Sequence, residues 1–310
     1  SRASKTKEER YPAEQLRIMP RAMSAHDWLK LGVKLAVSVA ALWLVLQHTD
    51  NRELLSLLEH AEAGWLAAAV LLFTLSKVAS AERLRMLFQH IGLFLGRWSH
   101  LKLYWLGMYY NLFLPGGIGG DGYKIFLLGR LTGLPYRSLL FTTLLDRVIG
   151  VLALGYVLLA LFGAAPQDSV PPWSCWLAIL LIHAAGSWLL RRQVPAYAPA
   201  FNKAALQSLC VQVLQVLQVL CLLRALDATG PIELYVLVFL LSSVAAALPV
   251  TIGGLGARQL TFFFGAQWLG LSVEPAVAIS LLFDLIAVAV SFLGIYYSFQ
   301  SARLRSDLVS

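Results

Sequence analysis

Two segments of the sequence place glycines and a basic residue at the same spacing. Residues 114–124 read LPGGIGGDGYK, and residues 248–258 read LPVTIGGLGAR. Glycine lets the backbone approach a ligand closely, and a helix that begins after such a loop offers unpaired N–H groups and a partial positive charge. A phosphate suits that environment. We therefore expect an anion to bind at the paired glycines and the basic residue of each motif: Gly119, Gly120 and Lys124 in the first, and Gly253, Gly254 and Arg258 in the second.

The basic residues of the two motifs have two explanations. A cation is unfavourable in the first turn of a helix, so Lys124 and Arg258 make better sense if an anion lies between the two helix ends. Alternatively, each pairs with a nearby carboxylate of Asp121, Asp146 or Asp284. The sequence leaves both explanations open.

Acidic residues also occur inside strongly apolar stretches. Asp146, with Arg147 beside it, and Asp284 each lie about eight residues, or roughly 12 Å, into a predicted helix. A charge near the centre of a bilayer costs at least about 2.5 kcal/mol, so such groups pair or face a polar cavity. We predict that Asp146 pairs with Arg258 and that Asp284 pairs with Lys124 or Arg147. Pairing with a purely structural role is the alternative.

Two further polar residues lie close to these stretches. We expect Asn111, just before the first glycine motif, to hydrogen-bond the backbone where the helix is interrupted. Lys77 lies near the end of another predicted span, and we expect its amine to extend to the membrane surface.

The elements that carry these residues are long apolar helices. Of the 310 residues 58% are hydrophobic and 14% are charged, whereas soluble domains carry about 25% charged residues. A bilayer core about 30 Å thick requires roughly 20 apolar residues per helix. The sequence therefore predicts an all-α integral membrane protein with about six full spans and two broken, re-entrant hairpins. The predicted spans are about 31–47, 64–81, 138–162, 173–190, 204–223 and 276–299, and the hairpins are 103–129 and 232–271.

The distribution of Lys and Arg predicts the orientation. Residues 1–29 form a basic segment, the stretch after the first span leans acidic, and the next span returns to Arg83 and Arg85. Because cytoplasmic loops are enriched in Lys and Arg, both termini are expected in the cytoplasm, with a tail at 301–310. The net charge of +8 has the same origin and does not indicate nucleic-acid binding. The chain is thus expected to be a multi-pass protein of the inner membrane, with a single transmembrane domain at 30–300.

The two motifs belong to a longer internal repeat. LLDRVIGVLALGY, around Asp146, resembles LFDLIAVAVSFLGIY, around Asp284. Each half thus has a span, a broken hairpin and a span with an internal Asp, over about 64–162 and about 204–299. The charge bias predicts that the hairpins enter from opposite sides, which is the inverted layout of secondary transporters with a site near the midplane. A duplicated packing motif without a transport role is the alternative.

These residues also carry a family resemblance. NLFLPGGIGGDGYK at 111–124, LLDRVIG at 144–150 and LPVTIGGLGARQ at 248–259 resemble the transmembrane, flippase-like region of the lysylphosphatidylglycerol synthase family. The resemblance covers roughly residues 30–300. It implies a membrane protein that moves or presents a lipid headgroup: an anionic phospholipid, an aminoacylated lipid or a polyprenyl phosphate. A lipid-modifying enzyme is the partner it implies.

The chain departs from that family's pattern in two places and in extent. Many relatives have Arg at the position of Lys124, and Arg binds phosphate in a bidentate geometry that Lys lacks. Many have Glu at the position of Gln259, so a carboxylate that could bind protons is missing. The soluble aminoacyl-transfer domain of the full synthases is not recognisable in the sequence, and synthesis of aminoacyl-lipid is not expected.

Together, these observations predict a lipid translocase. Lys124, Arg147 and Arg258 would bind an anionic headgroup, and Asp146 and Asp284 would balance the charge while the two halves rock. A membrane-embedded glycosyl or headgroup transferase, with Asp121 or Asp146 as base, is the second hypothesis, and a non-transporting partner of a lipid-modifying enzyme is the third. The sequence has no nucleophile motif, zinc cluster or nucleotide-binding phosphate loop, so we expect no catalytic residue, metal or cofactor.

Overall fold

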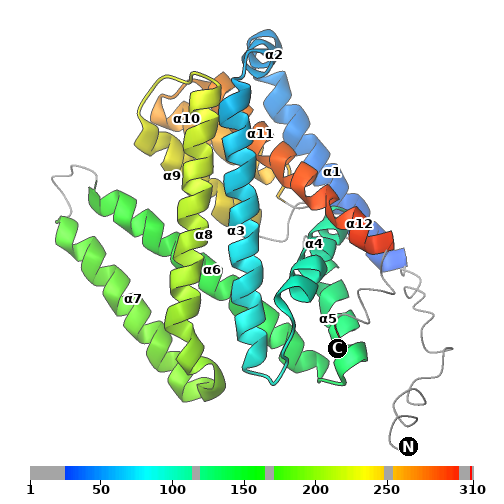
Figure 1. Cartoon of the computed structure of the whole chain (residues 1–310). Helices are drawn as coiled ribbons and strands as arrows, with labels where there is room; N and C mark the ends of the chain where they lie inside the picture. Colours follow the sequence, from blue (N-terminus) through cyan, green and yellow to red (C-terminus); the bar gives the residue numbers. More distant parts are fainter. Residues whose placement is uncertain (1–24, 114–118, 165–170, 248–253, 300–307, 309–310) are drawn as a thin grey trace, which may run out of the picture.

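The computed structural model describes residues 25–113, 119–164, 171–247, 254–299 and 308, and every regular element in them is a helix. The all-α prediction is therefore confirmed. The helices, shown in Figure 1, are α1 (Ala25–Gln47), α2 (Asn51–Glu59), α3 (Ala63–Gln89), α4 (Arg97–Phe113), α5 (Gly119–Thr132), α6 (Tyr136–Ala164), α7 (Pro172–Gln193), the short η3 (Pro195–Tyr197), α8 (Ala198–Ala225), α9 (Ile232–Ala247), α10 (Ala257–Leu269), α11 (Val273–Phe292) and α12 (Gly294–Phe299).

Five helical segments of the described residues are long and apolar enough to cross a membrane: α3, α6, α7, η3 with α8, and α11 with α12. Their outer surfaces are apolar too, since Trp173 and Leu180 on α7 are 63% and 66% exposed. Apolar side chains exposed over whole helices are stable in lipid and not in water. The chain is therefore a multi-pass membrane protein. The sixth predicted span falls in α1, whose apolar helical part is shorter, Leu35–Gln47, so the count of six stays a prediction.

The helices pack around a central pair. The long helices α3 and α8 lie side by side, with α7 on one side of them and α4 and α5 on the other, and α6 crosses both from α7 to α5 (Figure 1). An aromatic and aliphatic core joins α3, α8, α9, α10 and α11, and it buries Phe73, Tyr235 and Phe239 to 2% exposure or less. The helices that carry the described parts of the glycine motifs pack against this bundle, α5 on α4 and α6, and α10 on α9 and α11.

The described residues of the two glycine motifs, 119–124 and 254–258, lie at the start of the short helices α5 and α10. α4 and α5 have 17 and 14 residues and pack against one another, as do α9 and α10, which have 16 and 13 residues. None of the four reaches the roughly 20 residues that cross a bilayer. Most of the residues at which the breaks are predicted, 115–117, 249 and 253, lie outside the described residues, while Gly119 and Gly120 belong to α5. The re-entrant course of the two pairs stays a prediction.

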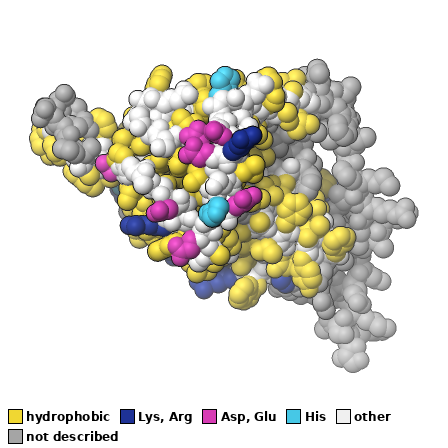
Figure 2. Space-filling model, turned by 90° about the horizontal axis from the view of Figure 1, so that it is seen from above, with side chains coloured by type: hydrophobic (Ala, Val, Ile, Leu, Met, Phe, Trp, Pro, Cys, Tyr) yellow, Lys and Arg dark blue, Asp and Glu magenta, His cyan; other side chains and the backbone are white. Residues whose placement is uncertain are grey.

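The two ends of the bundle carry opposite charge. Acidic side chains gather on the end where α2 lies (Figure 2), and the acidic residues there are Asp50, Glu53, Glu59, Glu62, Asp227, Glu233 and Glu274. At the other end, where α3 ends and α7 meets α8, basic residues prevail: Arg85, Arg130, Arg137, Arg191, Arg192 and Lys203. This asymmetry follows the loop charges from which the orientation is predicted.

Candidate functional site

A first ionic cluster lies where α5 meets α6. The Asp121 carboxylate accepts from two cations, since Oδ1 is 2.6 Å from Lys124 Nζ and Oδ2 is 2.9 Å from Arg147 Nε. Lys124 is buried, whereas the side chain of Arg147 is 38% exposed. One carboxylate therefore serves two positive charges. Lys124 follows the local explanation, in which the cation of the motif pairs with a nearby carboxylate.

The backbone around the first motif is held by close contact between α4 and α5. Gly120 packs so tightly on the Gly107 carbonyl that a Cβ at this position would overlap it. The Gly120 N–H donates to Asn111 Oδ1 at 2.8 Å, which confirms the hydrogen bond expected of Asn111. Because this N–H already has an acceptor within the protein, one of the unpaired N–H groups expected to bind an anion at the start of α5 is occupied.

A second cluster joins α3, α6 and α8. Arg83 makes a bidentate contact with Asp146, with Nε 2.6 Å from Oδ1 and Nη2 2.9 Å from Oδ2, and Nη1 donates to Ser208 Oγ at 2.7 Å. Charge-assisted fork contacts of this kind are among the strongest hydrogen bonds in proteins. The predicted pair of Asp146 with Arg258 is therefore wrong, because Arg83 occupies both oxygens.

Arg83 was not among the predicted site residues, although α3 contains a signal for it. Ser76, Ser80 and Arg83 are spaced by four and three residues, so they share one face of the helix, and all three are buried. A polar stripe on an otherwise apolar helix indicates a face turned to the protein interior. The loop charges, by contrast, predict that Arg83 lies with Arg85 at the cytoplasmic end of the span.

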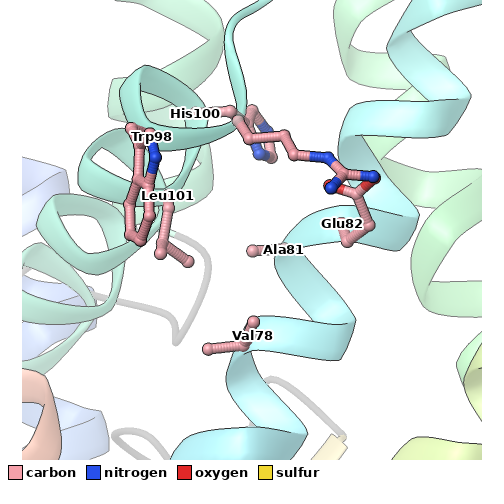
Figure 3. Close-up of a pocket in the computed structure, with 7 residues that line it drawn as sticks. Val78, Ala81, Glu82, Trp98, His100 and Leu101 are labelled. Atoms are coloured by element: carbon pink, nitrogen blue, oxygen red, sulfur yellow. The ribbon is translucent and has the colours of Figure 1, made fainter.

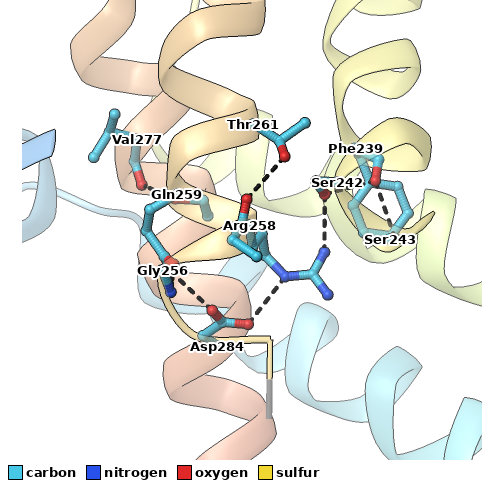
Figure 4. A network of polar contacts seen from close by, with 11 residues as sticks. Phe239, Ser242, Ser243, Gly256, Arg258, Gln259, Thr261, Val277 and Asp284 are labelled. Carbon is cyan, nitrogen blue, oxygen red and sulfur yellow. Dashed lines mark hydrogen bonds and ion pairs between the residues drawn. The ribbon is translucent and has the colours of Figure 1, made fainter. Parts of the chain in front are cut away.

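A third cluster lies in the second half of the chain (Figure 4). Arg258 Nε is 3.0 Å from Asp284 Oδ1, and its Nη1 donates to Ser242 Oγ at 3.1 Å. Gln259 Nε2 donates to Asp284 Oδ2 at 2.8 Å, and its Oε1 accepts from the N–H of Gly256 at 2.7 Å. The carboxylate is thus fully occupied. Pairing of Asp284 with the basic residues of the first half is therefore wrong.

Backbone geometry and aromatic rings complete this third cluster. Gly254 and Gly256 have φ of +89° and +87°, a conformation that only glycine adopts without strain. The Arg258 guanidinium lies 4.2 Å from the centroid of the Phe283 ring, a cation–π contact. Gly253, the remaining predicted residue of this motif, lies outside the described residues.

Lys77 lies between the second and third clusters. Its Nζ is 4.5 Å from the centroid of the Phe73 ring, one turn back toward the start of α3, so the prediction that it extends to the membrane surface is wrong. Phe73 meets Phe283 edge to face, which brings Lys77 close to Arg258. The charges of Arg258 and Arg83 both repel its ammonium. Among the described residues, no carboxylate lies within ion-pair distance of Lys77.

Tyr104 on α4 connects the first two clusters. Lys124 Nζ lies 4.7 Å from the centroid of its ring, while its hydroxyl forms a hydrogen bond with Ser80, which shares a face of α3 with Arg83. The three clusters and Lys77 are therefore consecutive parts of one polar region that runs through both halves of the chain.

The polar region has an excess of positive charge. Its five cations are Lys77, Arg83, Lys124, Arg147 and Arg258, and its three carboxylates are Asp121, Asp146 and Asp284. Unbalanced charge in a low-dielectric interior is costly, so this region favours an anion. Among the described residues, no group of three or more His, Cys, Asp or Glu side chains is placed to hold a metal ion.

Comparison with known proteins agrees with the resemblance seen in the sequence. The family model described as the lysylphosphatidylglycerol synthase TM region matches residues 32–209 and 196–294. The matched ranges contain all five cations and all three carboxylates of the polar region. No curated protein matches the chain. Because the match covers most of its length, the chain belongs to the lysylphosphatidylglycerol synthase TM region family, whose members are membrane proteins linked to lipid modification.

Proposed function

We propose that the chain binds the anionic headgroup of a membrane lipid in the polar region and moves it across the membrane. The observation that carries this proposal is Lys77, a cation in the membrane interior that has an aromatic contact and two neighbouring arginines but no carboxylate partner among the described residues. A lipid phosphate supplies the missing negative charge. The acyl chains would stay in the surrounding lipid.

The path of the headgroup follows from the order of the clusters. From α5 toward α11 it would meet Lys124, then Arg83, then Lys77 and finally Arg258, with Tyr104 between the first two. Each cation except Lys77 has a carboxylate beside it, so a moving phosphate exchanges one partner for another instead of leaving a bare charge. This sequence of exchanges lowers the cost of passage through a low-dielectric region.

We propose the orientation from the charges at the two ends. The end with Arg191 and Arg192 faces the cytoplasm, and the acidic end near α2 faces outward. Both termini then lie on the cytoplasmic side of the inner membrane. The pair α4 and α5 then enters from the cytoplasm and the pair α9 and α10 from outside. Two halves with inverted topology around a central site support alternating access.

Reconstitution into proteoliposomes with a leaflet-specific fluorescent probe tests this function. Phosphatidylglycerol, phosphatidylcholine and a polyprenyl phosphate, each labelled, are compared for movement between leaflets. We expect wild-type protein to move anionic lipids, and Lys77→Met to slow the movement by about tenfold or more, the effect of losing one charge-assisted contact. The control is Lys203→Met, which removes an exposed lysine at the start of α8 and should have no effect.

The Lys77→Met variant separates function from folding. Because it removes an interior cation that has no carboxylate partner in the described part of the chain, it should unfold at the same temperature as wild type or at a higher one. Movement at the wild-type rate in this variant would reject the site. A wild-type protein that moves none of the lipids would reject the function: chemical change of the lipid would then indicate a transferase, and its absence would indicate a partner of a lipid-modifying enzyme.

A further inference from the structure

A cavity of about 360 Å³ opens between α3 and α4, outside the three clusters (Figure 3). One wall is apolar and consists of Val78, Leu101 and Trp98. Val78 and Trp98 are 38% and 76% exposed, so this wall continues onto the lipid-facing surface of the bundle. An acyl chain has the shape and polarity to lie along it.

His100 lines the same cavity and has an unsatisfied nitrogen. The residue is 1% exposed, and its Nε2 has no hydrogen-bond partner among the described residues. A buried polar atom left in this state costs about 1–3 kcal/mol, which a ligand with a matching group removes. With its proton on Nε2, the imidazole donates to an anionic oxygen. The wall of the cavity therefore includes a residue with a nitrogen for which the described part of the protein supplies no partner.

Arg97 lies where the cavity opens. Its side chain is 78% exposed, and its Nη2 is 3.6 Å from Glu82 Oε1. Glu82 has a closer partner in Arg85, at 2.6 Å. The guanidinium of Arg97 is thus only loosely held by the carboxylate and keeps donors for a second acceptor. The exposed Arg97 and the buried His100 therefore flank the same apolar wall.

The position of His100 connects the cavity to the first cluster. Tyr104 is one helical turn further along α4, and the His100 and Tyr104 rings are 6.5 Å apart. The Lys124 ammonium lies over the Tyr104 ring, close enough to His100 for its positive charge to oppose protonation of the imidazole. A phosphate at His100 would therefore be separated from Lys124, the nearest cation of the polar region along α4, by the Tyr104 side chain.

We infer that this cavity is a binding site for a membrane phospholipid, whose phosphate accepts from Arg97 and His100 while an acyl chain lies against Val78, Trp98 and Leu101. The site would receive the headgroup from the basic end of the bundle and deliver it to Lys124, and in this respect it rests on the proposed function. Binding itself requires no movement across the membrane.

Photo-crosslinking locates the lipid. Wild-type protein in nanodiscs of phosphatidylcholine is supplied with phosphatidylglycerol that carries a diazirine in its headgroup, and labelled peptides are identified by mass spectrometry. We expect labels concentrated at residues 78–82 and 97–101. Arg97→Gln and His100→Phe should each reduce this labelling by roughly tenfold, the effect of one lost charge-assisted hydrogen bond.

Two control variants make the assignment specific. His100→Gln places an amide N–H near the position of Nε2, so it should keep most of the labelling that the phenylalanine variant loses. Arg137→Gln removes an exposed arginine at the same end of the bundle, at the start of α6, and should label as wild type does. If His100→Gln and His100→Phe lose labelling equally, the imidazole only fills space and the inference is wrong.

Other outcomes overturn the inference in distinct ways. Labels spread evenly over the apolar surface would show that no site exists, and displacement by millimolar inorganic phosphate would show a site for free phosphate and not for a lipid. Labelling of the cavity together with normal lipid movement in Lys77→Met would reject the proposed translocation path and leave the cavity as a lipid site. Movement that depends on Lys77 without labelling of the cavity would reject the cavity alone.

Discussion

The two halves of the chain use matching positions differently. In the second half the arginine of the glycine motif, Arg258, pairs with the aspartate of the following helix, Asp284. In the first half the matching residues are Lys124 and Asp146, and they do not pair with one another: Lys124 binds Asp121, and Asp146 binds Arg83.

Two substitutions between the halves explain the difference. Where the first half has Asp121 the second has Leu255, and where the first has Arg147 the second has Leu285. The first half therefore has an additional ion pair, while the corresponding leucines are 37% and 62% exposed. The second half has one matched pair with aromatic rings around it. We infer that the second half holds the more fixed arrangement and that the first half, with its surplus charge, exchanges partners more readily.

The largest expected effect comes from breaking the matched pair of the second half. Arg258→Met leaves Asp284 buried with only Gln259 as a partner, and loss of one member of a buried pair costs about 3–5 kcal/mol. Thermal unfolding in detergent micelles would measure it as a large fall in the unfolding temperature. The double variant Arg258→Met/Asp284→Leu should regain most of the loss, because no unpaired charge remains. A double variant no more stable than the single one would contradict the interpretation as a charge pair.

A smaller effect is expected where α4 and α5 touch. Gly120→Ala places a methyl group against the Gly107 carbonyl and should cost about 3 kcal/mol, at the upper range for overpacking. Gly122, two residues later in the same helix, has open space around its Cβ position. Gly122→Ala should therefore stabilise the protein by about 0.5–1 kcal/mol through helix propensity. Unfolding temperatures that shift in the same direction for both variants would show that the close contact does not matter.

The pairings show how far sequence reasoning reaches in a membrane protein. The apolar length of the helices and the hydrogen bond from the Gly120 N–H to Asn111 could be predicted, because each depends on local composition or on neighbours in the chain. The need for partners at Asp146 and Asp284 could be predicted from the cost of an unpaired charge.

The identity of the partners could not be predicted, because it depends on the rotation and depth of helices that are distant in the sequence. Arg83 is 63 residues before Asp146, and α3 with its 27 residues is longer than a bilayer requires, so a position near its end did not exclude burial. The predicted span of about 64–81 likewise places Lys77 near a membrane surface, although α3 continues to Gln89. The orientation of Lys77 toward Phe73 is a property of the packed core and has no signal in the local sequence.

The smallest change in stability is expected from Arg147→Leu, which gives the first half the residue that the second has at that position. Asp121 keeps Lys124 as a partner, and the replaced side chain is 38% exposed, so the free energy of unfolding should fall by about 1 kcal/mol or less. Movement of anionic lipid should nevertheless slow by about tenfold, since the cluster loses its surplus charge. Arg137→Leu, on the same helix but outside the cluster, is the control for both measurements.

This variant tests whether the additional ion pair distinguishes the halves in function or only in structure. A loss of several kcal/mol would mean that Arg147 supports the fold in the way that Arg258 does, and the contrast between a fixed half and an exchanging half would fail. An unchanged rate of lipid movement in Arg147→Leu would show that the surplus positive charge is not needed for that movement. A stable protein with slow movement of anionic lipid and unaltered movement of zwitterionic lipid would assign recognition of the headgroup charge to the first half, where, among the described residues, Asp121 has two cations beside it.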